Sequence, residues 1–205
     1  MSNIVVLDAL LGSIFYYFAR KCFHTIAPGR NFVPNWHLKA ITYELKRIER
    51  GETTRLIVNL PPRSGKSIWV SVAYVAWLLG HDPTLRIIVI SYSNELAAEL
   101  HRQFRMVLDS DWYQRLFPMT RLSKDTGLEA VTTVGGGRYA TSIEGSLTGR
   151  GADLIIIDDP HKAEEARSDR ALDQVEEWFS GTLRSRLDDL WRDGLYANKS
   201  GCLSL

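Results

Sequence analysis

Apolar residues recur along the chain with two different spacings, and their alternation predicts the fold class. Helical spacing predicts amphipathic helices over about 36–48 and 96–107, with Gly51 at the C-cap of the first and Asn94 at the N-cap of the second. Continuous apolar runs predict buried strands over 55–60, 86–92, 138–143 and 154–158. Strands that are apolar throughout and alternate with helices are typical of a mainly parallel sheet covered by helices on both faces. We therefore expect an α/β fold.

The segments between these elements give weaker signals. Residues 67–79 are apolar on all sides, which predicts a buried helix, and one more helix is expected where Leu172, Val175, Phe179 and Leu183 share a face. The prolines and glycine of residues 24–35 indicate a connector, while residues 109–137 are less regular. Residues 190–205 show neither period, so we expect no regular element there.

The first residues contain an apolar run over 4–19 that is open to two interpretations. It is short for a membrane span, Asp8 interrupts it, and no basic residues precede it as they would in a signal peptide. We interpret it as a packed helix in an N-terminal helical extension over 1–30, with a signal or anchor as the alternative.

Composition excludes several classes of protein. The 205 residues are 45% hydrophobic and 24% charged, which excludes a mostly disordered, collagen-like or coiled-coil chain. Cys22 and Cys202 form no C-x-x-C pair, so neither a zinc site nor a disulfide framework is indicated, and a reducing compartment is the default. The net charge of +1 means that contact with nucleic acid would depend on a local basic patch.

The most specific motif is the run PPRSGKS at 61–67, between an expected strand and an expected helix. Backbone N–H groups at a helix N-terminus bind phosphate oxygens, a lysine reaches the β- and γ-phosphates, and a hydroxyl binds Mg²⁺. Gly65, Lys66 and Ser67 fit these three roles, although Leu60 stands where the usual pattern has its first glycine. The alternative is a chance G-K-S at a helix start.

A pair of carboxylates, Asp158 and Asp159, ends the apolar strand LIIID. Phosphoryl-transfer ATPases need one carboxylate to hold Mg²⁺ and a base to orient the attacking water. Another strand and helix, and a further strand, separate Lys66 from Asp158, which suits the additional-strand class of P-loop NTPase. Taken alone, the pair could equally be two solvated acids before Pro160.

Several separate blocks of this chain, in the right order, resemble the ATPase domain of tailed-phage terminase large subunits. They are FVPNWHLKAI, NLPPRSGKS, RIIVISYSNELAAEL and GGGRYATSIEGSLTGRGADLIIIDDPHK. The resemblance covers about 30–188 and implies a P-loop ATPase domain over 31–189. It also implies a role in moving double-stranded phage DNA, with ATP and Mg²⁺ as cofactors.

The resemblance implies roles for individual residues. Asp158 and Ser67 would hold Mg²⁺, and Asp159 falls where many terminases have a catalytic glutamate, with Glu164 and Glu165 as outside possibilities. Arg63 would sense the γ-phosphate, the alternative being a solvent-facing charge. The nucleotide would be bound by Pro62, Arg63, Ser64, Gly65, Lys66, Ser67 and His37.

The assignments of two arginines and of two residues near position 36 stay open. Arg150 resembles an arginine finger that acts on the nucleotide of a neighbouring subunit, or is a turn arginine; Arg138 is a weaker candidate. Trp36 or His37 could contact the adenine base, but we expect Trp36 to pack in the core. We also expect Trp69, Trp77 and Trp178, which lie on apolar helical faces, to pack in the core.

The resemblance also implies partners and an incomplete chain. Portal protein, the small terminase subunit and a ring of identical subunits would be expected in the cytoplasm of a bacterial host, with no membrane. The family's coupling motif on a further strand and its RNase-H-like nuclease domain are not recognisable here, so we expect a truncated or frameshifted product with an atypical tail over 190–205. The alternatives are a deliberately short protein, a non-catalytic nucleotide-binding remnant, or a helicase-like repair ATPase.

Overall fold

The computed structural model describes residues 3–143, 145, 147, 149–160, 173, 177–183 and 195–198. Its sheet has seven strands in the order β1-β7-β6-β2-β5-β4-β3. The first five strands of that order run parallel, and β4 and β3 are antiparallel additions beside β5. The strands are β1 Leu56–Asn59, β2 Arg86–Ser91, β3 Leu122–Asp125, β4 Glu129–Thr132, β5 Gly137–Ser142, β6 Leu154–Asp158 and β7 Leu195–Asn198.

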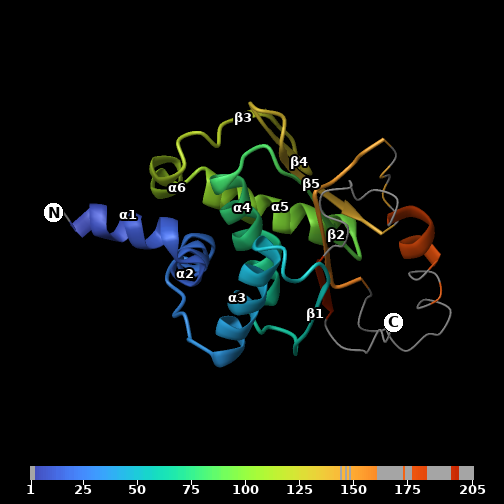
Figure 1. Ribbon diagram of the computed structural model, residues 1–205, viewed down its shortest axis with the longest axis horizontal. Coiled ribbons are helices and arrows are strands. Elements are labelled where there is room, and N and C mark those ends of the chain that lie inside the picture. The colour runs from blue at the N-terminus through green and yellow to red at the C-terminus, as the bar shows by residue number, and fades with distance from the viewer. Residues whose placement is uncertain are drawn as a thin grey trace.

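Helices cover both faces of this sheet (Figure 1). One face packs under most of the helices, and the other packs against Leu147, Ala152, Trp178 and Phe179. The helices are α1 Asn3–Ser13, α2 Phe15–Ile26, α3 Trp36–Glu49, the π-helix η1 Ile68–Tyr74, α4 Val75–His81, α5 Asn94–Leu108, α6 Asp111–Leu116 and the π-helix η3 Phe179–Leu183. The expected mainly parallel α/β sheet is confirmed.

Aromatic side chains join the N-terminal helix α2 to the helices that follow the PPRSGKS loop. Phe15 and Phe18 are fully buried, and both contact the Trp77 ring edge-on, at 5.7 and 5.3 Å between centroids. Trp69 stacks on Phe32 at 5.8 Å and donates its indole N–H to Thr42. Such pairs each contribute about 1 kcal/mol beyond area burial. Aromatic rings of α2 and of the connector before α3 therefore hold η1 and α4, the helices that follow the PPRSGKS loop.

The apolar run at the N-terminus forms two helices rather than one. The chain breaks at Ile14, which has extended backbone angles, and α1 protrudes from the body of the molecule (Figure 1). Phe15 and Phe18 of α2 are buried, whereas Ile4, Val5 and Val6 of α1 are more than half exposed. Packing is thus confirmed for α2 and for the end of α1, where Leu11 is 3% exposed. No helix in the described ranges is both long and apolar enough to cross a membrane.

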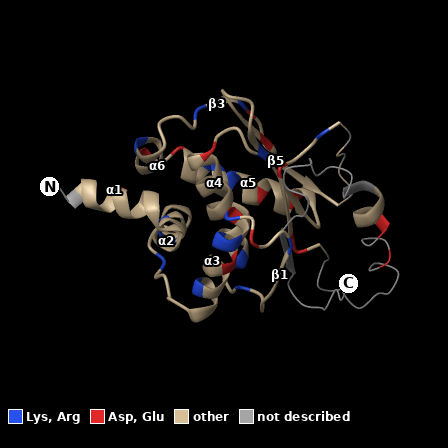
Figure 2. Cartoon of the chain, in the orientation of Figure 1, with Lys and Arg blue, Asp and Glu red and all other residues tan. Residues whose placement is uncertain are grey.

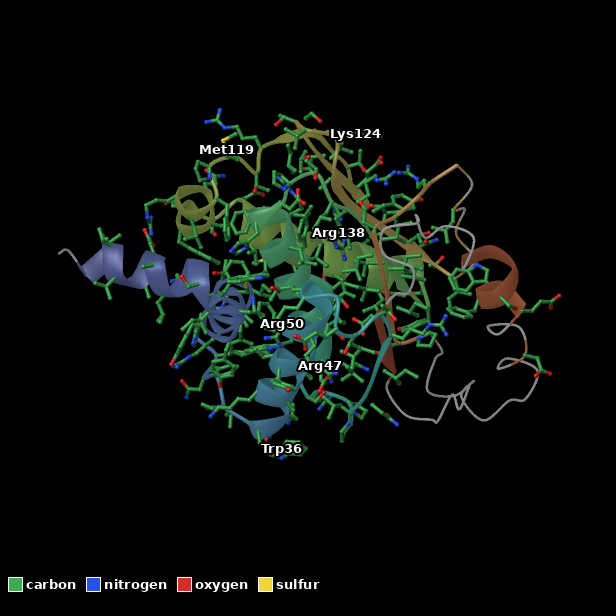
Figure 3. All side chains as sticks on the ribbon, viewed as in Figure 1. Trp36, Arg47, Arg50, Met119, Lys124 and Arg138 are labelled. Carbon is green, nitrogen blue, oxygen red and sulfur yellow. The ribbon has the colours of Figure 1, made fainter. Side chains whose placement is uncertain are left out.

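Three local expectations are wrong. Ser93, not Asn94, caps α5, because its side chain accepts the Leu96 N–H. Trp36 does not pack in the core but is 76% exposed at the start of α3, where its side chain points away from the ribbon (Figure 3). Residues 195–198 form an inner strand, β7, so the expectation of no regular element in 190–205 is wrong.

Candidate functional site

The PPRSGKS run at 61–67, here called the P-loop, connects edge strand β1 to η1. It lines a cavity of about 200 Å³ together with Asp159. Gly65 has a φ of 83°, a left-handed conformation that glycine adopts without steric cost. Arg63 is also left-handed, with a φ of 62°, and its side chain is exposed beside the cavity. Of the residues expected to bind nucleotide, the cavity collects six: Pro62, Arg63, Ser64, Gly65, Lys66 and Ser67.

Lys66 points into this site from the start of the helix and is almost fully buried. Its Nζ forms an ion pair of 2.9 Å with Oδ1 of Asp159, and both side chains are at most 4% exposed. Breaking a buried pair by removing one partner leaves an uncompensated charge, which costs several kcal/mol. Lys66 is therefore held at the mouth of the P-loop by the carboxylate that follows β6.

Asp158 ends β6 and accepts two hydroxyl hydrogen bonds. Ser67 Oγ donates to its Oδ1 at 3.1 Å, and Ser71 Oγ donates to its Oδ2 at 2.9 Å. Burial and the neighbouring charge of Asp159 raise the pKa of Asp158 to about 6, against the lowering effects of Ser71, Lys66 and Ser67. A cation at this carboxylate would stabilise its ionised form.

The side-chain oxygens of Ser67 and Asp158 fit Mg²⁺, a hard cation that prefers oxygen ligands. It binds through one or two carboxylates plus phosphates and waters rather than in an all-protein cage. A hydroxyl and a carboxylate already in contact, Ser67 and Asp158, match this chemistry beside the phosphate cavity. Within the described ranges no group of three His, Cys, Asp or Glu residues could form such a cage.

His37 contacts the P-loop. Its Nε2 lies 2.9 Å from the carbonyl oxygen of Ser64, and its side chain also lines, with Trp36 and Tyr43, a separate apolar hollow of about 340 Å³ along β1. Since a carbonyl only accepts, the ring must carry its proton on Nε2. His37 therefore anchors the loop to α3, and its contact with an adenine base stays a prediction.

The two other arginines singled out from the sequence lie away from the P-loop. Arg150 donates to Glu129 at 2.5 Å, and its guanidinium lies 3.7 Å from the centre of the Tyr139 ring. Arg138 is 1% exposed in β5, where its Nη1 donates to His101 at 2.7 Å. Its Nε and Nη2 have no hydrogen-bond partner within the described part of the chain. The structure does not bring either arginine to the phosphate cavity. Glu164 and Glu165 lie outside the described residues.

Ser71 is a site residue that sequence reasoning missed. The available signal was its spacing, four residues after Ser67, which places both hydroxyls on one side of a helix. That signal is weak, because a serine inside an apolar helix is common and needs no ligand.

Solved structures of phage large terminases have a fold similar to that of this chain. The HK97 bacteriophage large terminase is similar over 98% of this chain, with a TM-score of 0.58 and 15% identity. The fold is that of a phage large-terminase ATPase domain. The large-terminase ATPase domain of Thermus phage P74-26 matches over 89% of the chain with a TM-score of 0.51, and an arginine-to-alanine variant of it over 90% with 0.54, both at 18% identity.

These matches show the fold alone, and they are partial in length. The chain spans 38% of the HK97 terminase chain and 70% of each P74-26 ATPase domain. No family of known sequences matches this chain, and no curated protein does.

Proposed function

We propose that this chain binds ATP with Mg²⁺ and hydrolyses it as the motor domain of a terminase large subunit, driving double-stranded DNA into a phage capsid. The supporting observation is the pair of contacts that joins the P-loop to the end of β6: Lys66 with Asp159 and Ser67 with Asp158. A P-loop beside two acidic side chains is what phosphoryl transfer requires, because catalysis there depends on positioning and charge.

Each residue has a distinct task in this proposal. The backbone N–H groups of Ser64, Gly65 and Lys66 bind phosphate oxygens at the start of the helix. Lys66 exchanges its contact with Asp159 for the β- and γ-phosphates, and Asp159 then orients the attacking water. Ser67 and Asp158 hold Mg²⁺, which neutralises charge on the phosphates.

Arg63, exposed at the rim of the cavity, pairs with the γ-phosphate through its planar guanidinium. Arg150 acts on the nucleotide of a neighbouring subunit in a homo-oligomeric ring. The further partners proposed are portal protein and the small terminase subunit, in the cytoplasm of the bacterial host.

The test is ATP hydrolysis by the purified chain with and without Mg²⁺ and DNA, beside Lys66→Ala and Asp158→Ala. Turnover that requires Mg²⁺ and is lost in both variants supports the proposal. Turnover that survives in Lys66→Ala contradicts the assigned site. Nucleotide that raises the melting temperature without any turnover would support the second candidate, a nucleotide-binding remnant.

A further inference from the structure

Ser71 contacts the candidate metal-binding aspartate from inside the helix that follows the P-loop. Its side chain is fully buried in η1, one turn beyond Ser67, and its hydroxyl donates to Oδ2 of Asp158 at 2.9 Å. Ser67 donates to the other oxygen, Oδ1, at 3.1 Å. The two oxygens of one carboxylate are thus held by two hydroxyls of the same helix.

The helix that carries both serines has an unusual geometry. Residues Ile68–Tyr74 form a π-helix, which has more residues per turn and advances less per residue than an α-helix. Short π-helical segments occur frequently at functional sites. Residues four positions apart share one side of a helix, so Ser67, just before this segment, and Ser71, inside it, can contact one carboxylate.

We propose that Ser71 is a positioning residue that fixes the Asp158 carboxylate, so that Oδ1 is presented toward Mg²⁺ on the side of Ser67. This inference rests on the proposed function. Ser67 is only partly buried and lines the phosphate cavity, whereas Ser71 is fully buried and its hydroxyl donates to Oδ2. Groups that orient metal ligands through hydrogen bonds typically change metal affinity by about 10- to 100-fold when removed.

A neighbouring serine offers a matched control. Ser91 of β2 is the direct strand partner of Asp158, and it too is fully buried, but its Oγ has no hydrogen-bond partner among the residues that the structure describes. It therefore shares burial, residue type and proximity with Ser71 and lacks only the contact with the carboxylate.

The experiment measures the affinity of a fluorescent ATP analogue in EDTA and in excess Mg²⁺, for the wild type, Ser71→Ala, Ser71→Cys and Ser91→Ala. Thermal melts without nucleotide confirm that each variant is folded. We expect both Ser71 variants to reduce the Mg²⁺-dependent gain in affinity by about tenfold while the affinity in EDTA stays unchanged. Ser91→Ala should keep the full gain.

The outcomes separate the inference from the function on which it rests. A wild-type gain that is equally large in a folded Ser71→Ala or Ser71→Cys chain overturns the inference alone. An equal loss in EDTA and in Mg²⁺ also overturns it, because the defect is then in the P-loop as a whole. A wild-type chain with no Mg²⁺-dependent gain overturns the proposed function, and the inference with it.

Discussion

Asp159 has an unusual backbone, with a φ of 53° that non-glycine residues rarely adopt. Its ion pair with Lys66 is buried, so the surrounding structure holds this conformation in place. Residues in strained conformations cluster at functional sites, where the strain pre-organises a side chain. The pair with Lys66 thus keeps the carboxylate at the cavity until a phosphate competes for the lysine.

Replacing Asp159 by asparagine should destabilise the nucleotide-free chain. Asparagine tolerates the left-handed backbone, but Lys66 would lose its charged partner. We expect a loss of about 3 kcal/mol, or roughly 6–12 °C in melting temperature. Added ATP should restore most of this loss, because its phosphates supply the missing negative charge.

A matched exposed pair controls for simple loss of charge. Glu99 and Arg102 lie on the surface of α5 at 2.7 Å, so Glu99→Gln should change stability by no more than about 0.5 kcal/mol, with or without ATP. Equal melting shifts for Asp159→Asn in the presence and absence of nucleotide would contradict the exchange of partners proposed for Lys66.

His101 gives the fold a dependence on acid. Its Nδ1 accepts from Arg138 at 2.7 Å, Arg105 is a nearby cation, and Asp125 lies 4.0 Å from its Nε2. Burial, then the charges of Arg138 and Arg105, lower the pKa of His101 to about 4 from its ordinary 6.5. The unfolded chain therefore binds a proton before the folded chain does, and stability falls as pH decreases from 6.5 toward 4.

Replacing His101 by glutamine should remove this dependence, since an amide oxygen can accept from Arg138 and does not titrate. Relative to pH 8, the wild type should lose about 2 kcal/mol more than His101→Gln by pH 5. Urea unfolding of both proteins at the two pH values measures the difference. Stability curves that stay parallel between pH 8 and pH 5 would refute the assigned protonation.

At the scale of elements, β7 is the feature with the largest consequence. It lies between β1, which leads into the P-loop, and β6, which ends in Asp158. Tyr196 is the strand partner of both Ile57 and Ile157. The spacing between the P-loop and the carboxylates therefore depends on a strand from the end of the chain.

Proline at position 196 should weaken this arrangement, because proline cannot donate to a strand ladder and is tolerated only at sheet edges and bulges. We expect Tyr196→Pro to cost at least about 2 kcal/mol and to abolish nucleotide binding. Ser123→Pro, at the irregularity in edge strand β3, is the control and should cost less. Near-native melting and nucleotide binding in Tyr196→Pro would show that β7 is dispensable.

The site could be predicted from the sequence where a motif sits directly on a periodic element. The P-loop and the Asp158–Asp159 pair each end a continuous apolar strand, and parallel strands end at the same edge of a sheet. β7 could not be predicted, because four residues carry no period and their place depends on the gap between β1 and β6. The exposure of Trp36 likewise depends on what packs beside α3, which its spacing alone does not encode.

At the scale of the whole molecule, the two ends of the parallel strands carry different groups. The P-loop and both aspartates lie at the carboxyl ends of the parallel strands, whereas Arg150 lies before β6 and shares a cavity of about 320 Å³ with Arg86 and Gly137, which begin β2 and β5. Charged residues of both signs are interspersed on the helices in Figure 2, so that view shows no face of a single sign. Arg150 lies at the opposite end of the parallel strands from the P-loop and the two aspartates.

If Arg150 acts on a neighbouring subunit, mixing two inactive variants should restore turnover. In an equal mixture of Lys66→Ala and Arg150→Ala chains, about a quarter of random neighbour pairs in a head-to-tail ring join an intact P-loop to an intact Arg150. ATPase activity of the mixture should thus approach about one quarter of the wild-type rate, while each variant alone stays inactive. Arg86→Ala, from the same cavity, controls for local disruption and should be active by itself. An Arg150→Ala chain with full activity, or a mixture no more active than its parts, would place Arg150 outside the reaction, since a residue at the far end of the sheet can reach nucleotide only across a subunit boundary.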